Sequence, residues 1–332
     1  MIHKRFIIYL MSILMLLALV ACSGTATTVA VTSDTATASS GSEIADVLAV
    51  SEAAAAPASA AAALAETAAT QEPVAVADAA AAAADSSAVA IALNGDAISA
   101  DSAAVTVNGR VATITAAGTY ALSGALTDGQ IIVDTEDEAV VTLVLNGVDI
   151  SNSTTAPIAI LNAEEVVIVL ADNSANNVTD AADYVFPSAA EDEPNAAIFS
   201  NADLTLSGNG SLTVTGNFND AISSDDGLTI AGGTITVSAV DDGLRGKDYL
   251  LIQGGTINVA AAGDGLKSDN EDDATLGYVA IEGGVINVVA GGDAISAQTD
   301  VLITGGEFNL SAGGGSGAQV AADASAKGIK GL

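Results

Sequence analysis

The fold is decided by the stretch Asp242-Gly-Leu-Arg-Gly-Lys-Asp-Tyr-Leu-Leu-Ile-Gln-Gly-Gly-Thr-Ile-Asn-Val-Ala-Ala-Ala-Gly263. It begins with an aspartate, a small residue and an apolar residue. The same three-residue pattern recurs at Asp220, Asp264 and Asp293, and with lysine in place of aspartate at Lys327. Its glycine pair returns with the first glycine at positions 232, 254, 283 and 305, and only the middle interval is longer than the others. The chain therefore repeats a unit of about 22 residues with one seven-residue insertion, which indicates a solenoid.

Apolar and polar residues alternate within the unit, as in Ile235-Thr236-Val237. This is the period of a strand with one buried face. Three short strands and their turns fit in a unit of this length, which predicts a parallel β-helix, since helical repeats need an apolar period of 3.6. Alignment of the coils gives apolar columns whose members we expect to stack about 4.8 Å apart. The columns are Leu228, Leu250, Val279, Val301; Ile230, Ile252, Ile281, Ile303; Ile235, Ile257, Ile286, Phe308; and Ile222, Leu244, Leu266, Ile295, Ile329.

The N-terminus is typical of an export signal. Lys4 and Arg5 precede an apolar run, residues 6–20, that is short for a membrane span. The run ends in Leu19-Val-Ala-Cys-Ser23, which resembles the lipobox of bacterial lipoproteins. We therefore expect residues 1–22 to be a lipoprotein signal and Cys22 to carry the lipid. The exported domain would then be anchored to the cell membrane or outer membrane and face the extracellular or periplasmic side. The alternative is an ordinary secretory peptide or an anchor helix.

Residues 23–88 consist mainly of alanine, serine and threonine and are predicted to be a disordered linker, although residues 53–69 could be transiently helical. The β-helix domain is expected at 89–332. Its first coils, with strand-like segments such as 105–107, 111–115 and 131–133, are irregular, as an end cap should be. The chain stops at Leu332 within a new coil. Because a solenoid needs a cap, we expect a truncated chain or a partner at that end.

The charge excludes some classes of partner. The chain has 41 acidic and 8 basic residues and a formal net charge of −33, which would repel nucleic acid and anionic headgroups. Membrane contact is therefore expected through the lipid alone. No nucleophile with a neighbouring base is available, since the single histidine, His3, lies in the signal and the single cysteine is Cys22. The single cysteine also excludes an intrachain disulfide.

Acidic residues recur at one position of the coil. Asp220, Asp242, Asp264 and Asp293 form an aspartate column directly before the third strand. Stacked carboxylates repel unless a cation or hydrogen-bond donors compensate, and calcium takes six to eight oxygen ligands. We therefore predict calcium as the cofactor. The alternative is that each aspartate caps its own turn through backbone amides. The predicted metal ligands are Asp220, Asp225, Asp226, Asp241, Asp242, Asp248, Asp264 and Asp269.

Basic residues gather beside this column. Arg245 and Lys267 are one coil apart, and Lys247 lies two residues from Arg245. This basic strip either meets a carboxylate-bearing or hydroxyl-rich polymer or neutralises the neighbouring aspartates. Tyr249 and Tyr278 share a column, where they could stack on sugar rings or pack on each other. These five residues are the predicted ligand-binding set.

Six phrases resemble the bacterial carbohydrate-binding β-helix lipoproteins, which are related in fold to pectate lyases. They are Ala117-Gly-Thr-Tyr-Ala-Leu-Ser-Gly124, Leu143-Val-Leu-Asn-Gly-Val-Asp-Ile150, Ala197-Ile-Phe-Ser200, Asp242-Gly-Leu-Arg-Gly-Lys-Asp248, Gly263-Asp-Gly-Leu-Lys-Ser268 and Lys327-Gly-Ile-Lys330. The resemblance implies a right-handed, single-stranded parallel β-helix that binds polysaccharide, with calcium at Asp-Asp-Gly turns. Asp241, Asp242 and Asp264 fit that pattern. The coils at 219–220, 292–293 and 326–327 keep one acid or none.

Three functions follow as hypotheses. The first is a non-catalytic surface lipoprotein that binds an extracellular uronic-acid or cellulosic polysaccharide with the help of calcium. The second is a calcium-dependent, pectate-type lyase in which Arg245 or Lys267 removes the proton α to the carboxyl group. The third is a structural adhesin or spacer. Lyase chemistry needs a deprotonable base in a dry cleft, and a strongly acidic, flat face offers little desolvation, so we favour binding without catalysis.

Overall fold

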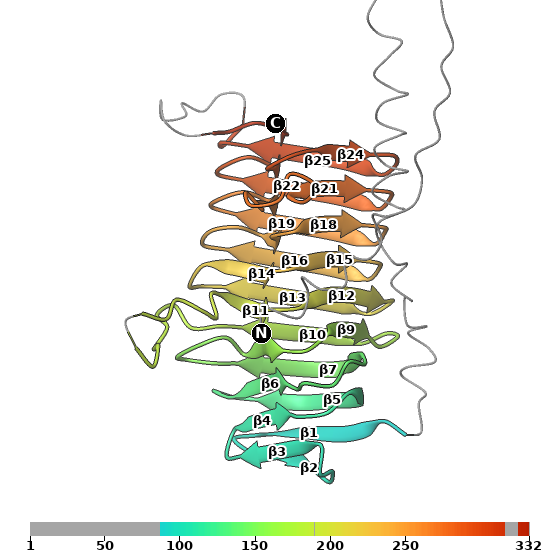
Figure 1. The fold of residues 1–332 in the computed structure, drawn as a ribbon, viewed down its shortest axis with the longest axis vertical. Helices are drawn as coiled ribbons and strands as arrows, with labels where there is room; N and C mark the ends of the chain where they lie inside the picture. The colour runs from blue at the N-terminus through green and yellow to red at the C-terminus, as the bar shows by residue number, and fades with distance from the viewer. Residues whose placement is uncertain (1–86, 189, 316–324, 332) are drawn as a thin grey trace, which may run out of the picture. The chain divides into compact units, whose positions relative to one another are not determined.

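The computed structural model describes residues 87–188, 190–315 and 325–331. The predicted signal, Cys22 and nearly all of the predicted linker lie outside this range. The described part is all-β and forms a parallel β-helix (Figure 1), as the sequence repeat predicts. Within it, no helix has the length and apolar character that a membrane span requires.

Each regular coil contributes one strand to each of three faces. Faces 1 and 2 are joined into one 16-stranded sheet, and face 3 is a separate 10-stranded sheet. Face 1 consists of β9 (Glu165–Leu170), β12 (Asp203–Gly208), β15 (Gly227–Ile230), β18 (Tyr249–Ile252), β21 (Tyr278–Ile281) and β24 (Val301–Ile303). Face 2 consists of β10 (Ala175–Thr179), β13 (Ser211–Gly216), β16 (Thr234–Ala239), β19 (Thr256–Ala261), β22 (Val285–Ala290) and β25 (Glu307–Ala312). Face 3 runs through β8 (Ile158–Asn162), β11 (Ala196–Ser200), β14 (Asp220–Ser224), β17 (Leu244–Gly246), β20 (Leu266–Ser268), β23 (Ile295–Ala297) and β26 (Ile329–Lys330).

The first strands close one end of the helix. β1 (Val89–Gly95) pairs antiparallel with β2 (Ile98–Ala100), and β3 (Val105–Asn108) pairs antiparallel with β4 (Val111–Ile114). The parallel coils then begin with β5 (Gly118–Leu126), β6 (Gln130–Asp134) and β7 (Val141–Ser151). The long strand β7 pairs with β9 through its first half and with β10 through its second, so it joins faces 1 and 2. The irregular end cap is confirmed.

The apolar columns stack in the predicted register. Leu228 pairs with Leu250, Ile235 with Ile257, and Leu244 with Leu266. Their side chains are fully buried in one continuous core. Removal of each such side chain from water contributes about 1.5 to 3 kcal/mol, which makes these columns the main source of stability.

The second glycine of each pair turns the chain from face 1 to face 2. Gly233, Gly255, Gly284 and Gly306 have φ angles of 87°, 91°, 100° and 105°. Side chains other than glycine are strained in this conformation, which explains why the second glycine recurs in these four coils.

The last column members are less buried than those of the preceding coils. Phe308 is 37% exposed, Ile303 39% and Ile329 47%, because the described residues place no further coil over them. A side chain that points inward is buried only where a coil lies on each side of it.

Candidate functional site

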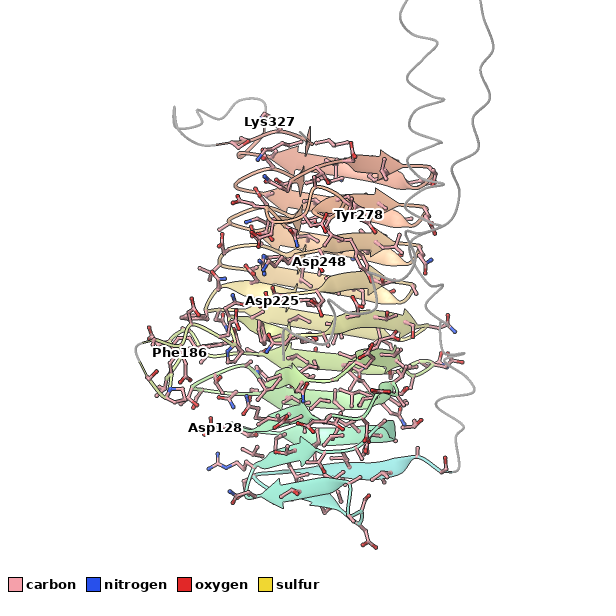
Figure 2. All side chains as sticks on the ribbon, viewed as in Figure 1. Asp128, Phe186, Asp225, Asp248, Tyr278 and Lys327 are labelled. Carbon is pink, nitrogen blue, oxygen red and sulfur yellow. The ribbon has the colours of Figure 1, made fainter. Side chains whose placement is uncertain are left out.

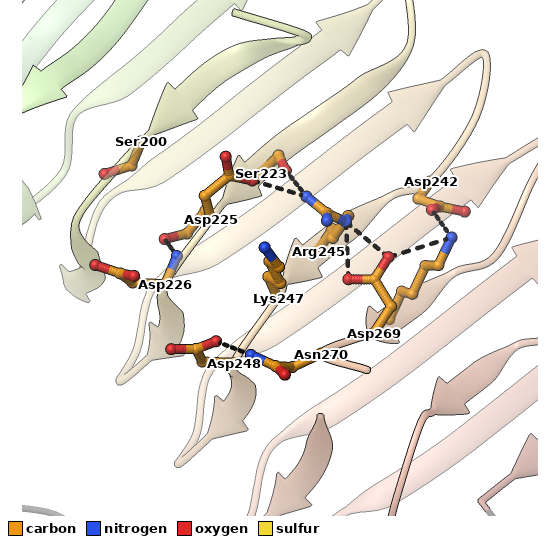
Figure 3. A network of polar contacts seen from close by, with 12 residues as sticks. Ser200, Ser223, Asp225, Asp226, Asp242, Arg245, Lys247, Asp248, Asp269 and Asn270 are labelled. Atoms are coloured by element: carbon orange, nitrogen blue, oxygen red, sulfur yellow. Dashed lines mark hydrogen bonds and ion pairs between the residues drawn. The ribbon is translucent and has the colours of Figure 1, made fainter. Parts of the chain in front are cut away.

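The predicted acidic and basic residues meet on face 3 and in its neighbouring turns. Figure 3 shows this polar cluster, and Figure 2 shows Asp225 and Asp248 on successive coils of the same helix. Arg245 and Lys267 are the central residues of β17 and β20, and each is flanked by two inward, buried residues. The alternation of these short strands therefore directs both basic side chains outward.

The aspartate column is a buried ladder. The backbone N–H of Asp242 donates to Asp220 Oδ1 at 3.0 Å, and that of Asp264 donates to Asp242 Oδ1 at 2.7 Å. The same bond joins the Asp293 amide to Asp264 and the Lys327 amide to Asp293, at 2.7 and 2.6 Å. Asp220, Asp242 and Asp293 are only 2%, 3% and 1% exposed, so an outward, solvent-facing column is not what the structure shows. Backbone amides do cap these aspartates, but the amides belong to the next coil and not to the residue's own turn.

One acidic cluster is compact enough to hold a cation. Carboxylate oxygens of Asp220, Asp241 and Asp242 lie within 4.8 Å of one another. Burial, together with the charge of Asp242, raises the pKa of Asp220 to about 7. Burial also raises the pKa of Asp241. Gly263 makes room for this cluster, because a Cβ at that position would lie 2.3 Å from Asp241 Oδ1. The remaining predicted ligands do not join it.

Arg245 is held by two carboxylates and a hydroxyl. Its Nε donates to both oxygens of Asp269, at 3.1 and 3.0 Å, and its Nη1 donates to Ser223 Oγ at 3.1 Å and to Asp225 Oδ1 at 3.2 Å. Burial alone would lower the pKa of Arg245, but the hydrogen bonds and charge of Asp269 and Asp225 outweigh it and raise the pKa. The side chain is 16% exposed. This geometry favours neutralisation of aspartates over a free polymer-binding strip.

Lys267 is also paired with aspartates. Its Nζ lies 2.7 Å from Asp242 Oδ2 and 3.8 Å from Asp269 Oδ2. Burial lowers its pKa and the charge of Asp242 raises it, with a net increase. Asp269, predicted as a metal ligand, thus bridges the two basic side chains. Lys247 belongs to the same polar cluster in Figure 3 and is only partly buried.

The other predicted residues have structural contacts. Asp248 accepts a hydrogen bond from Asn270 Nδ2 at 2.5 Å, and its pKa is raised by burial. The backbone N–H of Asp226 donates to Ser224 Oγ at 3.2 Å, within the turn that leads from β14 to β15. Asp264 is half-buried, and burial raises its pKa. None of these three carboxylates belongs to the compact acidic cluster of the described residues.

Tyr249 and Tyr278 stack on each other across face 1. Their ring centroids are 5.7 Å apart with the planes at 15°, and Tyr249 Oη donates to Asp203 Oδ1 at 3.2 Å. Tyr278 is 6% exposed. The geometry favours mutual packing, and a role in sugar binding stays a prediction for these two residues.

Sequence reasoning did not place the acidic loop between β10 and β11 at this site. Burial is the main cause that raises the pKa of Glu193 to about 7, and a hydrogen bond with Asp225 is the next largest. Glu193 therefore belongs to the Arg245 cluster. The ring of Tyr184, on this loop, stacks on that of Phe218 with centroids 4.2 Å apart. Phe186, on the same loop as Tyr184, has its centroid 6.0 Å from that of Phe218 (Figure 2). A sequence signal for Phe218 exists, because the path from Gly216 to Ile222 is one residue longer than the path between their register partners Ala239 and Leu244.

Comparison with known proteins agrees with this fold. A solved structure described as the polysaccharide lyase-like protein from C. thermocellum, gadolinium derivative, matches with a TM-score of 0.68 and 39% identity over 74% of this chain and 95% of that one. The fold is therefore that of a polysaccharide lyase-like β-helix.

Residues 108–332 match the family described as carbohydrate-binding domain-containing protein. The chain belongs to this family. A relative of the same description from Acetivibrio thermocellus is 47% identical over 135 residues, which are 41% of this chain and 47% of the relative. The match thus spans about half the length of that curated relative. The predicted resemblance is confirmed as to carbohydrate-binding family and β-helix fold.

Proposed function

We propose that this domain binds extracellular polysaccharide without cleaving it. The observation that carries the proposal is the state of the two basic side chains. Arg245 and Lys267 each form ion pairs with aspartates at 3.2 Å or less, and those contacts raise both pKa values. A general base must lose its proton near the working pH, and these groups are held in the charged form.

The lyase alternative is supported by the solved neighbour, which is described as polysaccharide lyase-like. One experiment on the exported domain distinguishes binding from lyase activity. Polygalacturonate is supplied with calcium or with chelator, absorbance at about 235 nm reports the unsaturated product of β-elimination, and co-sedimentation reports binding to insoluble polysaccharides. We expect binding with no rise in absorbance. A calcium-dependent rise that Lys267→Met abolishes would establish the lyase.

We further propose that calcium assists binding at the cluster of Asp220, Asp241 and Asp242. Both oxygens of Asp242 are already bonded, Oδ1 to the Asp264 amide and Oδ2 to Lys267, whereas Asp220 uses only Oδ1 in the ladder. Asp220 and Asp241 would therefore hold the ion, and water or sugar oxygens would complete its six to eight ligands. Bound calcium would supply positive charge to a ligand hydroxyl or carboxylate.

Thermal unfolding tests the calcium proposal. Calcium at 100 times its dissociation constant should stabilise the domain by about 2.7 kcal/mol relative to excess chelator. Asp241→Asn should remove most of that gain, while Asp101→Asn, at an exposed aspartate of the end cap, should keep it. Melting curves that coincide with and without calcium would leave the ladder as a purely structural device.

We also propose that Cys22 anchors the protein through a lipid, since Leu19–Ser23 matches the lipobox and Cys22 has no disulfide partner in the chain. Detergent-phase partitioning of the expressed full chain is the measurement. The wild type and Ser23→Ala should enter the detergent phase, and Cys22→Ala should stay in the aqueous phase. Partitioning of Cys22→Ala with the wild type would refute lipid attachment at this residue.

A further inference from the structure

Face 2 carries an open, nearly uncharged surface on a strongly acidic protein. Three rows of outward side chains cross β10, β13, β16, β19, β22 and β25, and none of these side chains is buried. The first row is Ala175, Ser211, Thr234, Thr256, Val285 and Glu307; the second is Asn177, Thr213, Thr236, Asn258, Asn287 and Asn309; the third is Thr179, Thr215, Ser238, Ala260, Val289 and Ser311. Glu307 is the one charged residue among them.

The other two faces differ from it. The central outward residues of face 1 are buried, with Thr229, Leu251 and Ala280 at 1%, 8% and 3% exposure. On face 3 the charged side chains Arg245 and Lys267 are paired with aspartates. Face 2 is therefore the face whose outward side chains remain available to a ligand.

A groove of about 410 Å³ crosses β16, β19, β22 and β25 on this face. Its floor is the backbone of the strands, and its walls are the second and third rows. One wall is formed by amides and a hydroxyl, from Thr236, Asn258, Asn287 and Asn309. The other includes Ala260 and Val289, and Val289 is 60% exposed. Because the rows run across the strands, the groove repeats its side chains about every 4.8 Å.

The amide wall is oriented by its own hydrogen bonds. Asn287 Nδ2 donates to Asn258 Oδ1 at 3.0 Å, and Asn258 Nδ2 donates to Thr236 Oγ1 at 3.4 Å. A carboxamide has two N–H donors and two lone pairs, so each of these asparagines keeps a donor after the ladder is formed. The row presents fixed, neutral hydrogen-bonding groups at the spacing of the coils.

We propose that this groove binds an extended, uncharged polysaccharide, an inference that rests on the proposed polysaccharide-binding function and names its substrate class. A pyranose ring carries hydroxyl groups around its edge and C–H groups on its faces. The amide wall can bond the hydroxyls while Ala260 and Val289 contact the C–H faces, so both parts of the sugar meet complementary groups. The coil spacing is close to the length of one sugar residue in an extended β-linked chain, so successive sugars meet equivalent side chains.

The charge of the protein favours an uncharged polysaccharide over a uronic-acid polymer. A uronic-acid polymer needs cations, and the groove lining contains none, while the chain around it carries a net charge of −33. The polymer would be repelled at low salt. A second groove, of about 430 Å³ beside the insertion loop, is lined by Glu271, Asp272, Asp273 and Asp300 and repels the same polymers. A neutral polysaccharide meets no such repulsion on face 2.

Affinity electrophoresis of the exported domain tests the proposal. Native gels contain a mixed-linkage β-glucan, a galactomannan, an arabinoxylan or polygalacturonate, each with calcium or with chelator. We expect retardation by at least one of the three uncharged polysaccharides that persists in chelator, because none of the residues proposed to hold calcium lines this groove. Asn287→Ala and Val289→Glu should each weaken it at least tenfold, which is about 1.4 kcal/mol. Thr179→Glu adds the same charge to the same row on β10, outside the groove, and should bind as the wild type does.

The outcomes separate this inference from the function it rests on. Retardation by a neutral polysaccharide that neither groove variant changes, with both variants folded by circular dichroism, would overturn the groove as the site and leave polysaccharide binding intact. Retardation by polygalacturonate alone, dependent on calcium and on Asp241, would overturn the uncharged substrate class. Absence of binding to all four polymers would overturn both proposals.

Discussion

At the scale of single residues, burial decides how much a charged side chain contributes to the stability of the fold. Arg245 and Arg110 both form ion pairs with aspartates. The side chain of Arg245 is 16% exposed and faces Asp225 and Asp269, whereas that of Arg110 is 44% exposed and faces Asp128 at 3.0 Å. Exposed pairs contribute little because water and salt screen them, while loss of one partner from a buried pair leaves an uncompensated charge.

Arg245→Ala should therefore lower the free energy of unfolding by about 2 to 3 kcal/mol, between the values for exposed and fully buried pairs. Arg110→Ala is the matched control and should cost less than about 1 kcal/mol. Urea unfolding of the two variants measures both. Equal losses would mean that the Arg245 cluster is solvated in solution.

Asp220 should make stability depend on pH when calcium is removed. Its pKa in the folded protein is about 7, above the ordinary value of 3.8, because of burial and the charge of Asp242. Between about pH 4 and pH 7 the folded state then holds a proton that the unfolded state has lost, so stability falls as the pH rises, by at most about 1.4 kcal/mol per unit for this one group. Asp220→Asn should flatten the slope in chelator and Asp101→Asn should not. Parallel slopes in all three proteins would contradict the assignment.

At the scale of elements, the turn at Gly254 and Gly255 depends on one of its two glycines. Gly255 has a φ of 91°, and a Cβ there would lie 2.7 Å from the carbonyl oxygen of Gly233 on the preceding coil. At Gly254 a Cβ would meet nothing closer than 3.6 Å. In this turn the second glycine is needed for conformation and for close stacking, and the first is not.

Gly255→Ala should consequently destabilise the domain by more than about 1 kcal/mol, through left-handed backbone strain and the contact with the preceding coil. Gly254→Ala should leave the free energy of unfolding within about 0.5 kcal/mol of wild type. Thermal unfolding of the pair provides the comparison. If Gly254→Ala were the more damaging variant, this account of the turn would be wrong.

The elements also show how far sequence reasoning reaches. The register of columns such as Leu250 over Leu228 was predictable, because a repeat places equivalent residues in equivalent environments. The pairing of Arg245 with Asp269 was not, since Asp269 lies in an insertion that breaks the period and direct contact depends on a loop path. The approach of Glu193 to Asp225 was hidden for the same reason. Periodicity predicts the contacts that recur from coil to coil. The contacts of the candidate site come largely from loops that do not recur.

At the scale of the whole molecule, net charge opposes compactness. A formal charge of −33 makes the folded chain repel itself, and salt screens that repulsion. In chelator, an increase in sodium chloride from about 10 mM to about 500 mM, which shortens the screening length from about 30 Å to less than about 8 Å, should raise the melting temperature. Potassium chloride should act equally, because screening depends on ionic strength alone. A melting temperature that salt lowers would show that attractive ion pairs dominate.

The aspartate ladder has a direction along the chain. In every rung the carboxylate belongs to the earlier coil and the amide to the later one, from Asp220 with Asp242 to Asp293 with Lys327. A growing end therefore always presents an acceptor that the next segment of chain is about to fill. Coils that assemble from the N-terminal cap would therefore follow the order of synthesis, and each new coil would complete the one before it.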